Sequence, residues 1–413
     1  MTARRLTAVD AQMLLLAAAT PNDQFLLYGF GAPVDPGAAL EVVREHANRC
    51  PELAVQARDR GVWRYPVWRP CDTADEQFVV HDATGWAGVL ATMTSLAGEQ
   101  VDAHDRPWRL HVFPVVDGLP GADVGSVAVL QISHALADGS RASALAARLF
   151  GRAAAIEPLT PRPTRGFLGR SAMAALAHRR LVRDTDAGLV PAQANPCPAL
   201  RCNSRPTGAA HVRTVVRRRG QLAGPTVTVT ALSAISEALA DHVRAYGDDP
   251  AQLRAEIPMA KPGARRANNH FGNVSVALHP DLPARQRMQA IAAELRDRRR
   301  RASHPAMAAQ DAAFAAVPAP LLYWGMGQFD PEQRSQTVAG NTVVSSVNRG
   351  PADLSLGGAP VVLTAGFPAL SPMMGLTHGV HGIGDTVVVS VHAVDSAIGD
   401  IDAYVERLDA ALG

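Results

Sequence analysis

Residues 127 to 150 read VAVLQISHALADGSRASALAARLF, and this stretch decides the fold of the chain. Its first part, Val127 to Ile132, is almost wholly apolar and rich in β-branched residues, as expected for a strand buried on both faces. From Ser140 onward, apolar residues recur with helical spacing, and Ser140 itself is placed to cap the helix. The stretch therefore predicts a buried strand, a short loop and an amphipathic helix.

The predicted loop carries a histidine, an aspartate and a glycine at a defined spacing. His134 follows the strand directly, while Asp138 and Gly139 precede the helix. Strand ends commonly present reactive groups, and an imidazole titrates near neutral pH. Gly139 permits a tight turn or a close approach by a substrate. A core histidine beside an ordinary helix cap is the alternative, but this spacing in this context favours a functional loop.

Ser133-His134-Ala-Leu-Ala-Asp138-Gly139 resembles the His-His-x-x-x-Asp-Gly motif of the chloramphenicol acetyltransferase-like superfamily. The superfamily includes non-ribosomal peptide condensation domains and the wax ester synthase/diacylglycerol acyltransferases. The first motif histidine is Ser133 here, and the second, which is catalytic in the family, is His134. The resemblance implies an α/β (α+β) fold of two similar subdomains, each a mixed β-sheet flanked by helices, with a tunnel at their interface.

The order of segments is most similar to that of the wax ester synthase/diacylglycerol acyltransferase family. Leu6-Thr-Ala-Val-Asp10-Ala11 resembles its opening Leu-Ser-Pro-Leu-Asp-Ala, and Gly272-Asn273 resembles its Gly-Asn segment. Two departures stand out. Thr228-Val229 replaces an Asn-Asp pair at the start of a helix, and Asn348-Arg349-Gly350-Pro351 carries an arginine where the family has the first proline of Asn-Val-Pro-Gly-Pro.

The chain divides into a predicted N-terminal subdomain, 1–160, a proline-rich linker, 161–212, and a C-terminal subdomain, 213–413. Periodicity predicts helices and strands on both sides of the linker. The expected helices cover 36–50, 87–96, 140–150, 171–183, 227–246, 285–301 and 400–412. The expected strands include 24–30, 110–116, 127–132, 214–217, 254–259, 274–278, 342–347 and 386–394. Arg298 to Arg301 is either a solvated helix end or a phosphate-attracting surface.

The bulk properties exclude several functional classes. A net charge of +2 provides no field for nucleic acid, so we expect no nucleic-acid partner. The four scattered cysteines do not resemble a disulfide framework, and no apolar run reaches the length of a membrane span. We therefore expect a cytoplasmic monomer without a transmembrane segment, which leaves peripheral membrane contact open. His378, His381 and His392 are interpreted as strand or loop histidines, and no metal site is predicted.

Transfer of an acyl group from a thioester needs a base that takes the proton of the acceptor, and His134 is assigned this role. By family analogy Asp138 forms a salt bridge that holds the loop, with Arg49 and Arg58 as candidate partners, and Gly139 completes the catalytic motif. Asn273 and Ser346 are the predicted oxyanion donors. Ser133 and Asn348 complete the predicted substrate-side set. No resident cofactor is expected, because coenzyme A or phosphopantetheine would arrive as the thioester co-substrate.

Three functions remain open. The first is an O-acyltransferase that uses acyl-CoA, and the second is a condensation-like enzyme that joins groups bound to an acyl carrier protein to an alcohol or amine acceptor. The third is a degenerate relative that only binds a ligand, which Ser133 and the missing Asn-Asp pair leave open. A serine hydrolase is excluded because we find no Gly-x-Ser-x-Gly motif.

Overall fold

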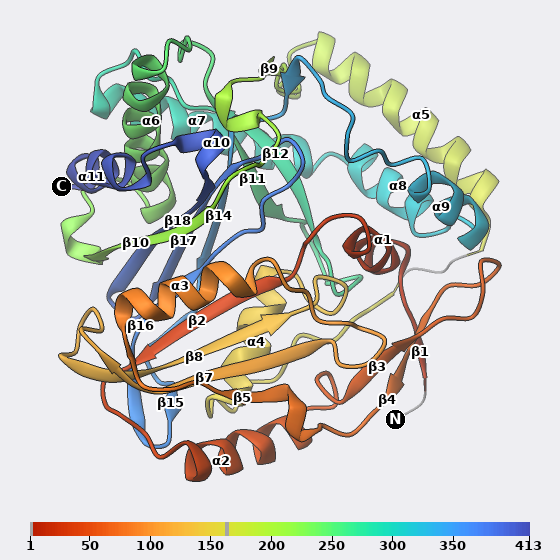
Figure 1. Cartoon of the computed structure of the whole chain (residues 1–413). Helices are drawn as coiled ribbons and strands as arrows, with labels where there is room; N and C mark the ends of the chain where they lie inside the picture. The colour runs from red at the N-terminus through yellow and green to blue at the C-terminus, as the bar shows by residue number, and fades with distance from the viewer. Residues whose placement is uncertain (1–2, 162–164) are drawn as a thin grey trace.

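The computed structural model describes residues 3–161 and 165–413, which form two lobes (Figure 1). The N-terminal lobe is built on a seven-stranded sheet in the order β15-β16-β2-β8-β7-β5, with β6 paired to β7. Its strands are β2 (Gln24–Phe30), β5 (Phe78–Val80), β6 (Thr84–Gly85), β7 (Trp108–Asp117), β8 (Val124–Ile132), β15 (Ser355–Leu356) and β16 (Ala359–Gly366). Because β5 and β6 run parallel to β7 while the other pairs are antiparallel, the sheet is mixed.

Helices cover both faces of this sheet, as the alternation of strand side chains requires. Leu26 and Tyr28 of β2 point into a core shared with α2 (Pro36–Asn48) and α4 (Gly139–Leu149). Leu27, on the opposite face, packs with α3 (Trp86–Leu96) and with strands of the other lobe. The remaining elements are α1 (Ala8–Ala17), η1 (Asp75–Gln77) and a small sheet of β1 (Arg4–Arg5), β4 (Val67–Pro70) and β3 (Val55–Arg58).

The C-terminal lobe is built on a six-stranded sheet in the order β10-β18-β17-β14-β11-β12. Its strands are β10 (Ala210–Arg218), β11 (Arg254–Ala260), β12 (Phe271–Ala277), β14 (Thr342–Asn348), β17 (Leu376–Ile383) and β18 (Thr386–Val394). The pairs β11–β14 and β14–β17 are parallel, so this sheet is also mixed. Its helices are α6 (Val227–Ala245), α7 (Ala284–Ala302), α10 (Asp395–Ile398) and α11 (Ile401–Leu412). The predicted class, two lobes that each carry a mixed sheet and flanking helices, is confirmed.

The lobes are interlocked by β16, which lies far along the chain but pairs antiparallel with β2 of the N-terminal sheet. Thr364 of β16 is directly opposite Tyr28. By sequence position β15 and β16 fall within the predicted C-terminal subdomain, but they extend the N-terminal sheet. The two sheets are therefore joined by the linker and by this crossing strand.

The segment between the halves contains α5 (Phe167–Asp186), β9 (Cys197–Pro198) and η2 (Arg201–Asn203), and η3 (Arg219–Gln221) follows β10. Residues 162–164 of the predicted linker lie outside the described residues. Two helices not predicted from the sequence, α8 (Pro305–Phe314) and α9 (Ala319–Met326), pack against α5 and α1, and β13 (Thr337–Val338) pairs with β9. The arginine run at the end of α7 holds this segment, because Arg298 donates to Ala192 O (2.6 Å) and Arg301 to Pro191 O (2.9 Å).

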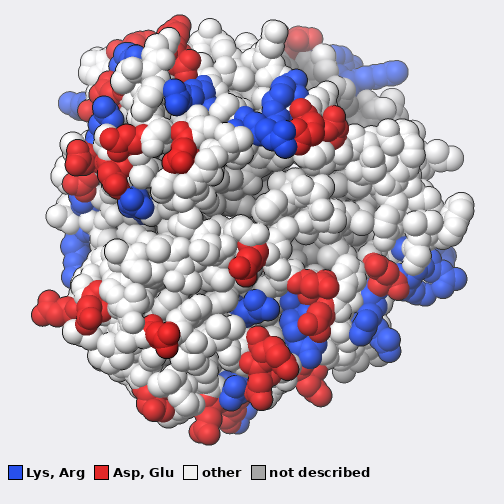
Figure 2. Space-filling view, viewed as in Figure 1, with Lys and Arg blue, Asp and Glu red and all other residues white. Residues whose placement is uncertain are grey.

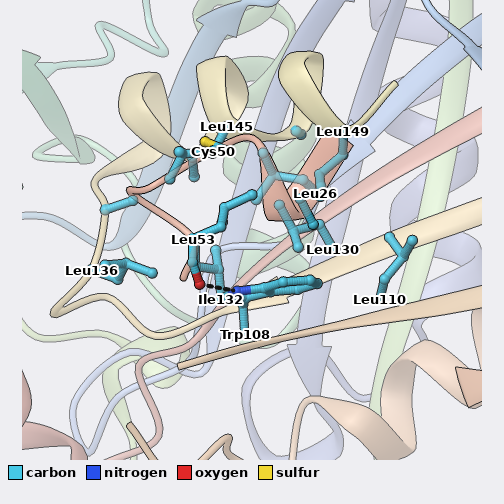
Figure 3. Packing of buried hydrophobic residues seen from close by; sticks show 14 of the residues in the cluster. Leu26, Cys50, Leu53, Trp108, Leu110, Leu130, Ile132, Leu136, Leu145 and Leu149 are labelled. Carbon is cyan, nitrogen blue, oxygen red and sulfur yellow. Dashed lines mark hydrogen bonds between the residues drawn. The ribbon is translucent and has the colours of Figure 1, made fainter. Parts of the chain in front are cut away.

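Beneath the predicted loop lies a dense apolar core (Figure 3). Leu145 and Leu149 of α4 point toward Leu26 and Leu130 of the sheet. Trp108 is fully buried at the start of β7, and its indole nitrogen donates to Leu53 O at 2.9 Å. This packing fixes the end of β8 and the start of α4, the two elements that carry the loop.

The distribution of surface charge and the character of the helices agree with the low net charge and the absence of long apolar runs in the sequence. Figure 2 shows acidic and basic side chains interspersed over the visible face, without a large area of one sign. Among the described residues, no helix combines the length and apolar character that a bilayer span requires.

Candidate active site

Asp138 is the residue that begins α4. Its carboxylate accepts hydrogen bonds from Arg141 N and Ser140 Oγ, both at 2.9 Å, and Gly139 is the first helical residue. The prediction of Ser140 as the N-cap is therefore wrong, because the cap is Asp138, two positions earlier. The physical reason is that the Asp138 side chain reaches the free amide at the third helical position, as an N-cap residue does. The loop consists of residues 133–138.

Arg265, from the loop before β12, is the partner of Asp138. Its guanidinium lies 2.7 Å from Asp138 Oδ2, both side chains are buried, and His270 N donates to the same oxygen at 2.8 Å. Burial raises the pKa of Asp138, but the Arg265 hydrogen bond and charge outweigh it and hold the pKa below its usual value. The predicted salt bridge exists, whereas both predicted partners are wrong.

The two rejected arginines are occupied elsewhere. Arg49 pairs with Glu45 on its own helix at 2.5 Å, and Arg58 donates to Gln56 at 3.2 Å. Both candidates lie in the N-terminal lobe, while the true partner is 127 residues from Asp138 and comes from the other lobe. The loop is thus fastened across the interface of the lobes.

His134 is held by Asn269, a residue that the motif did not reveal. His134 Nδ1 lies 2.7 Å from Asn269 Oδ1, and Asn269 Nδ2 donates to the backbone oxygen of His134 at 2.8 Å. Asn269 Nδ2 also donates to Asp10 Oδ1 at 3.0 Å. Asp10 belongs to α1, so the arrangement joins three distant segments of the chain. The only sequence signal was a polar loop, residues 265–270, together with the family-like opening that contains Asp10.

The imidazole of His134 has its second nitrogen available. The ring is partly exposed, packs 5.6 Å from the Phe271 ring centroid, and its Nε2 has no hydrogen-bond partner among the residues that the structure describes. Burial lowers the pKa of His134, while the hydrogen bonds to its own backbone and to Asn269 and the charges of Asp138 and Asp10 act in the opposite direction. A neutral imidazole with a free nitrogen can accept a proton.

The residues predicted on the substrate side have other partners. Asn273, exposed on β12, donates to Glu256 Oε1 at 2.6 Å, and Ser346 on β14 lies 2.8 Å from Thr228 Oγ1. Asn348 accepts from Gly350 N at 3.0 Å, and the buried Ser133 accepts from Ala135 N at 3.3 Å. Their predicted roles toward a substrate remain predictions.

Gly139 marks a close approach of the two lobes. A Cβ atom built on it would lie 3.5 Å from Gln24 Oε1 and 3.6 Å from Val347 Cγ2. Val347 is on β14, the strand that also carries Ser346 and Asn348. The start of α4 therefore faces the strand from which two of the predicted substrate-side residues come.

A cavity of about 570 Å³ lies beside this centre, between the N-terminal segment, the 261–270 loop and the end of α8. Asn269 and His270 form part of its wall, so the cavity reaches the residue that binds His134. Its lining contains an excess of positive charge and several apolar side chains: Arg4, Arg5, Lys261 and Arg266, with Leu6, Val9 and Phe314, and Asp311 as the one carboxylate. Asp311 pairs with Lys261 at 2.8 Å.

His378 and His392 of the C-terminal sheet make structural contacts. His378 lies 2.8 Å from both Thr342 Oγ1 and Tyr404 Oη, and His392 Nδ1 lies 3.0 Å from Pro368 O. The described part of the chain contains no group of three histidine, cysteine or carboxylate side chains arranged to hold a metal ion.

Comparison with known proteins gives a family match for the C-terminal part and structural matches for the whole chain. The family model described as the WS/DGAT C-terminal domain matches residues 267–413. No curated protein sequence matches the chain.

Two solved structures have similar folds. The wax ester synthase/diacylglycerol acyltransferase from Marinobacter aquaeolei VT8 has a TM-score of 0.64 at 16% identity, over 99% of this chain and 98% of that chain. A mutant starter condensation domain of rhizomide synthetase RzmA, in complex with C8-CoA and Leu-SNAC, has a TM-score of 0.59 at 14% identity, over 100% of this chain and 93% of that chain. The family resemblance predicted from the sequence is thereby confirmed for residues 267–413, and the predicted fold is confirmed for the whole chain.

Proposed function

We propose that this chain, whose residues 267–413 match the WS/DGAT C-terminal domain, is an acyltransferase of that family and moves an acyl group from a thioester to a hydroxyl acceptor, with His134 as general base. The observation that carries the proposal is the state of His134. Its Nδ1 is engaged by Asn269 at 2.7 Å, while Nε2 is free of partners among the described residues and the ring is partly exposed. A base needs this combination of a fixed ring and a free lone pair.

In the proposed reaction, His134 Nε2 removes the hydroxyl proton as the acceptor oxygen attacks the thioester carbonyl. The tetrahedral intermediate then collapses, the carbon–sulfur bond breaks, and the leaving sulfur takes the proton back from Nε2. The imidazole therefore ends the cycle neutral. Asp138 and Arg265 hold the loop and do not contact the reacting atoms, while Asn273 and Ser346 remain the candidate donors to the oxyanion.

The cationic cavity supports a thioester that carries phosphate. Coenzyme A and phosphopantetheine both combine phosphate with a narrow pantetheine arm, and guanidinium groups bind phosphate well. Arg4 and Arg266 line the cavity and form no ion pair in the described structure; Arg4 interacts only at longer range with Asp10 and Glu52, and Arg266 donates to Thr160 O at 3.1 Å, so both can still attract such a ligand. No resident cofactor is needed, because the thioester is itself consumed.

A condensation-like reaction is the second candidate, favoured by the fold shared with the RzmA starter condensation domain. There the donor would be carried by an acyl carrier protein and the acceptor would be an amine or alcohol. Activity assays with two substrate pairs separate the two reactions. One pair is acyl-CoA with a long-chain alcohol or diacylglycerol, and the other is an acylated acyl carrier protein with a polar acceptor. A reducing cytoplasm is the proposed location, since all four cysteines are free thiols.

Replacement of His134 by alanine tests the proposal. General-base catalysis contributes about 100- to 10,000-fold, so we expect kcat for the accepted donor to fall within that range. His178→Ala, on the exposed surface of α5, is the matched control and should retain full activity. Turnover that survives in His134→Ala would refute the role of the base, and a native protein that turns over no donor would favour the binding-only alternative.

A further inference from the structure

We propose that Asn269 and Asp10 are positioning residues that fix the tautomer of His134 and thereby make Nε2 the reactive nitrogen. The inference rests on the proposed function, because it concerns the same imidazole. It extends beyond the His-x-x-x-Asp-Gly loop, since neither residue belongs to that motif.

The hydrogen bonds of Asn269 determine which way its amide is turned. Its Nδ2 donates to Asp10 Oδ1 at 3.0 Å and to the backbone oxygen of His134 at 2.8 Å. Both partners can only accept, so the nitrogen must face them and Oδ1 must face the ring. An amide oxygen can only accept, and the 2.7 Å contact therefore requires a proton on His134 Nδ1. In the neutral ring the lone pair is then on Nε2.

Asp10 is the group that keeps Asn269 in this orientation. Its Oδ1 accepts from Asn269 N at 2.9 Å as well as from Nδ2, and its Oδ2 accepts from Asn268 N at 3.2 Å and Thr7 Oγ1 at 2.8 Å. The carboxylate is buried and forms no salt bridge within the described structure. All these partners donate, so a rotated Asn269 amide would place its oxygen against a carboxylate oxygen.

The arrangement also places the Asp10 carboxyl behind the imidazole; burial raises the pKa of Asp10, while its hydrogen bonds from Asn269, Thr7 and Asn268 favour the ionised form. When Nε2 takes a proton the ring becomes a cation, and Asp10 stabilises it through the neutral Asn269 amide. The other charged or titratable groups around this centre are Asp138 and Arg141 of α4 and its cap, Arg265 and His270 in the loop before β12, and Arg4 near Asp10. Arg265 neutralises Asp138 through their 2.7 Å pair. Asp10 forms no ion pair within the described structure, and Arg4 and Arg141 act on it only at longer range.

The positioning depends on closure of the lobes. His134 lies in the loop that follows β8 of the N-terminal sheet, Asn269 in the loop that enters β12, and Asp10 in α1. A movement that separated these segments would free His134 to change tautomer. The base is therefore competent only in the assembled interface.

The tautomer can be measured without turnover, by ¹⁵N NMR of His134 in the full-length protein. We expect wild type to show a protonated Nδ1 and a free Nε2, and Asn269→Leu to show a mixture of tautomers. Asn203→Leu is the matched control, because Asn203 is equally buried and donates to two backbone oxygens, Gly340 O and Met373 O, in the C-terminal lobe. A wild-type ring protonated on Nε2 would overturn the inference, whatever the enzyme catalyses.

Kinetics give the second readout. Loss of a residue that orients a reactive group typically costs about 10- to 100-fold in activity, so we expect Asn269→Leu to lower kcat by that factor with little change in KM, and Asn203→Leu to leave both unchanged. Asp10→Asn removes the charge behind the ring, so the acid limb of kcat/KM should move to lower pH. The positioning role would be rejected if kcat were unchanged in both Asn269→Leu and Asp10→Asn and the acid limb of kcat/KM did not move in Asp10→Asn. If His134→Ala were active while the NMR result held, the proposed reaction would be wrong and the positioning correct.

Discussion

Replacing Arg265 by methionine removes the cation that faces Asp138 and keeps a side chain of similar length. Both side chains of the pair are buried, with 8% and 6% exposure, and breaking a buried pair from one side costs about 3–5 kcal/mol. Asp138 would retain the hydrogen bonds from Arg141 N, Ser140 Oγ and His270 N. We therefore expect the lower end of that range, a loss of about 3 kcal/mol in the free energy of unfolding.

Urea denaturation at neutral pH measures this loss. Arg58→Met is the control, because Arg58 is exposed and donates only to Gln56, and its replacement should change stability by less than about 0.5 kcal/mol. The double variant Asp138→Asn with Arg265→Met should be more stable than Arg265→Met alone, since no unpaired charge stays buried. A cost below about 1 kcal/mol for Arg265→Met would refute the assignment of this pair.

The pH dependence has a defined sign. Because Arg265 holds the folded-state pKa of Asp138 below its unfolded value, the stabilisation is complete above the unfolded value and is lost as pH falls through the lower folded value. In Arg265→Met, the Asp138 carboxyl is buried without a neighbouring cation, and this favours its protonated form. The stability difference between wild type and variant should accordingly narrow as the solution is acidified.

Two further predictions concern the core and the thiols. Trp108→Ala should lower the free energy of unfolding by about 3–5 kcal/mol, because it empties a fully buried site and leaves Leu53 O without its donor; denaturation of Trp108→Phe, expected to cost less, is the comparison (Figure 3). Burial raises the pKa of Cys50 to about 11 and that of Cys202 to about 12, so iodoacetamide followed by mass spectrometry should show Cys71, which is partly exposed, modified first. Equal labelling of all three would contradict the burial of the other two.

Local patterns predicted the elements of this fold well, because they depend on residues close together in the chain. The predicted strand 24–30 has the observed bounds of β2, and α4 was located to within one residue. The helix α8 was missed because it is short and rich in alanine, and α9 because it has only 8 residues; neither has more than a weak apolar stripe. Asp138 replaced Ser140 as the cap because a side chain two residues earlier reaches the free amide.

Contacts between distant segments could not be read from the sequence. The motif located His134, but Asn269 and Asp10 reach it from 135 positions further along and from the first helix. Arg265 was likewise visible only as one of two arginines in a polar loop, and its pairing with Asp138 in place of Arg49 depends on how the lobes pack. Nothing in the local periodicity of residues 359–366 specifies β2 as their partner.

The crossing of β16 has a consequence for any attempt to divide the protein. Cleavage within residues 161–212 would leave the first fragment with β2 as a bare sheet edge and the second with β16 bonded to β15 alone, its other edge unpaired. Each fragment should aggregate when it is alone, and the two fragments should reassociate when they are mixed. For the same reason, a chimaera with a related protein would need β16 and the N-terminal sheet from the same parent. The segments that can be exchanged between relatives therefore do not coincide with the two halves of the sequence.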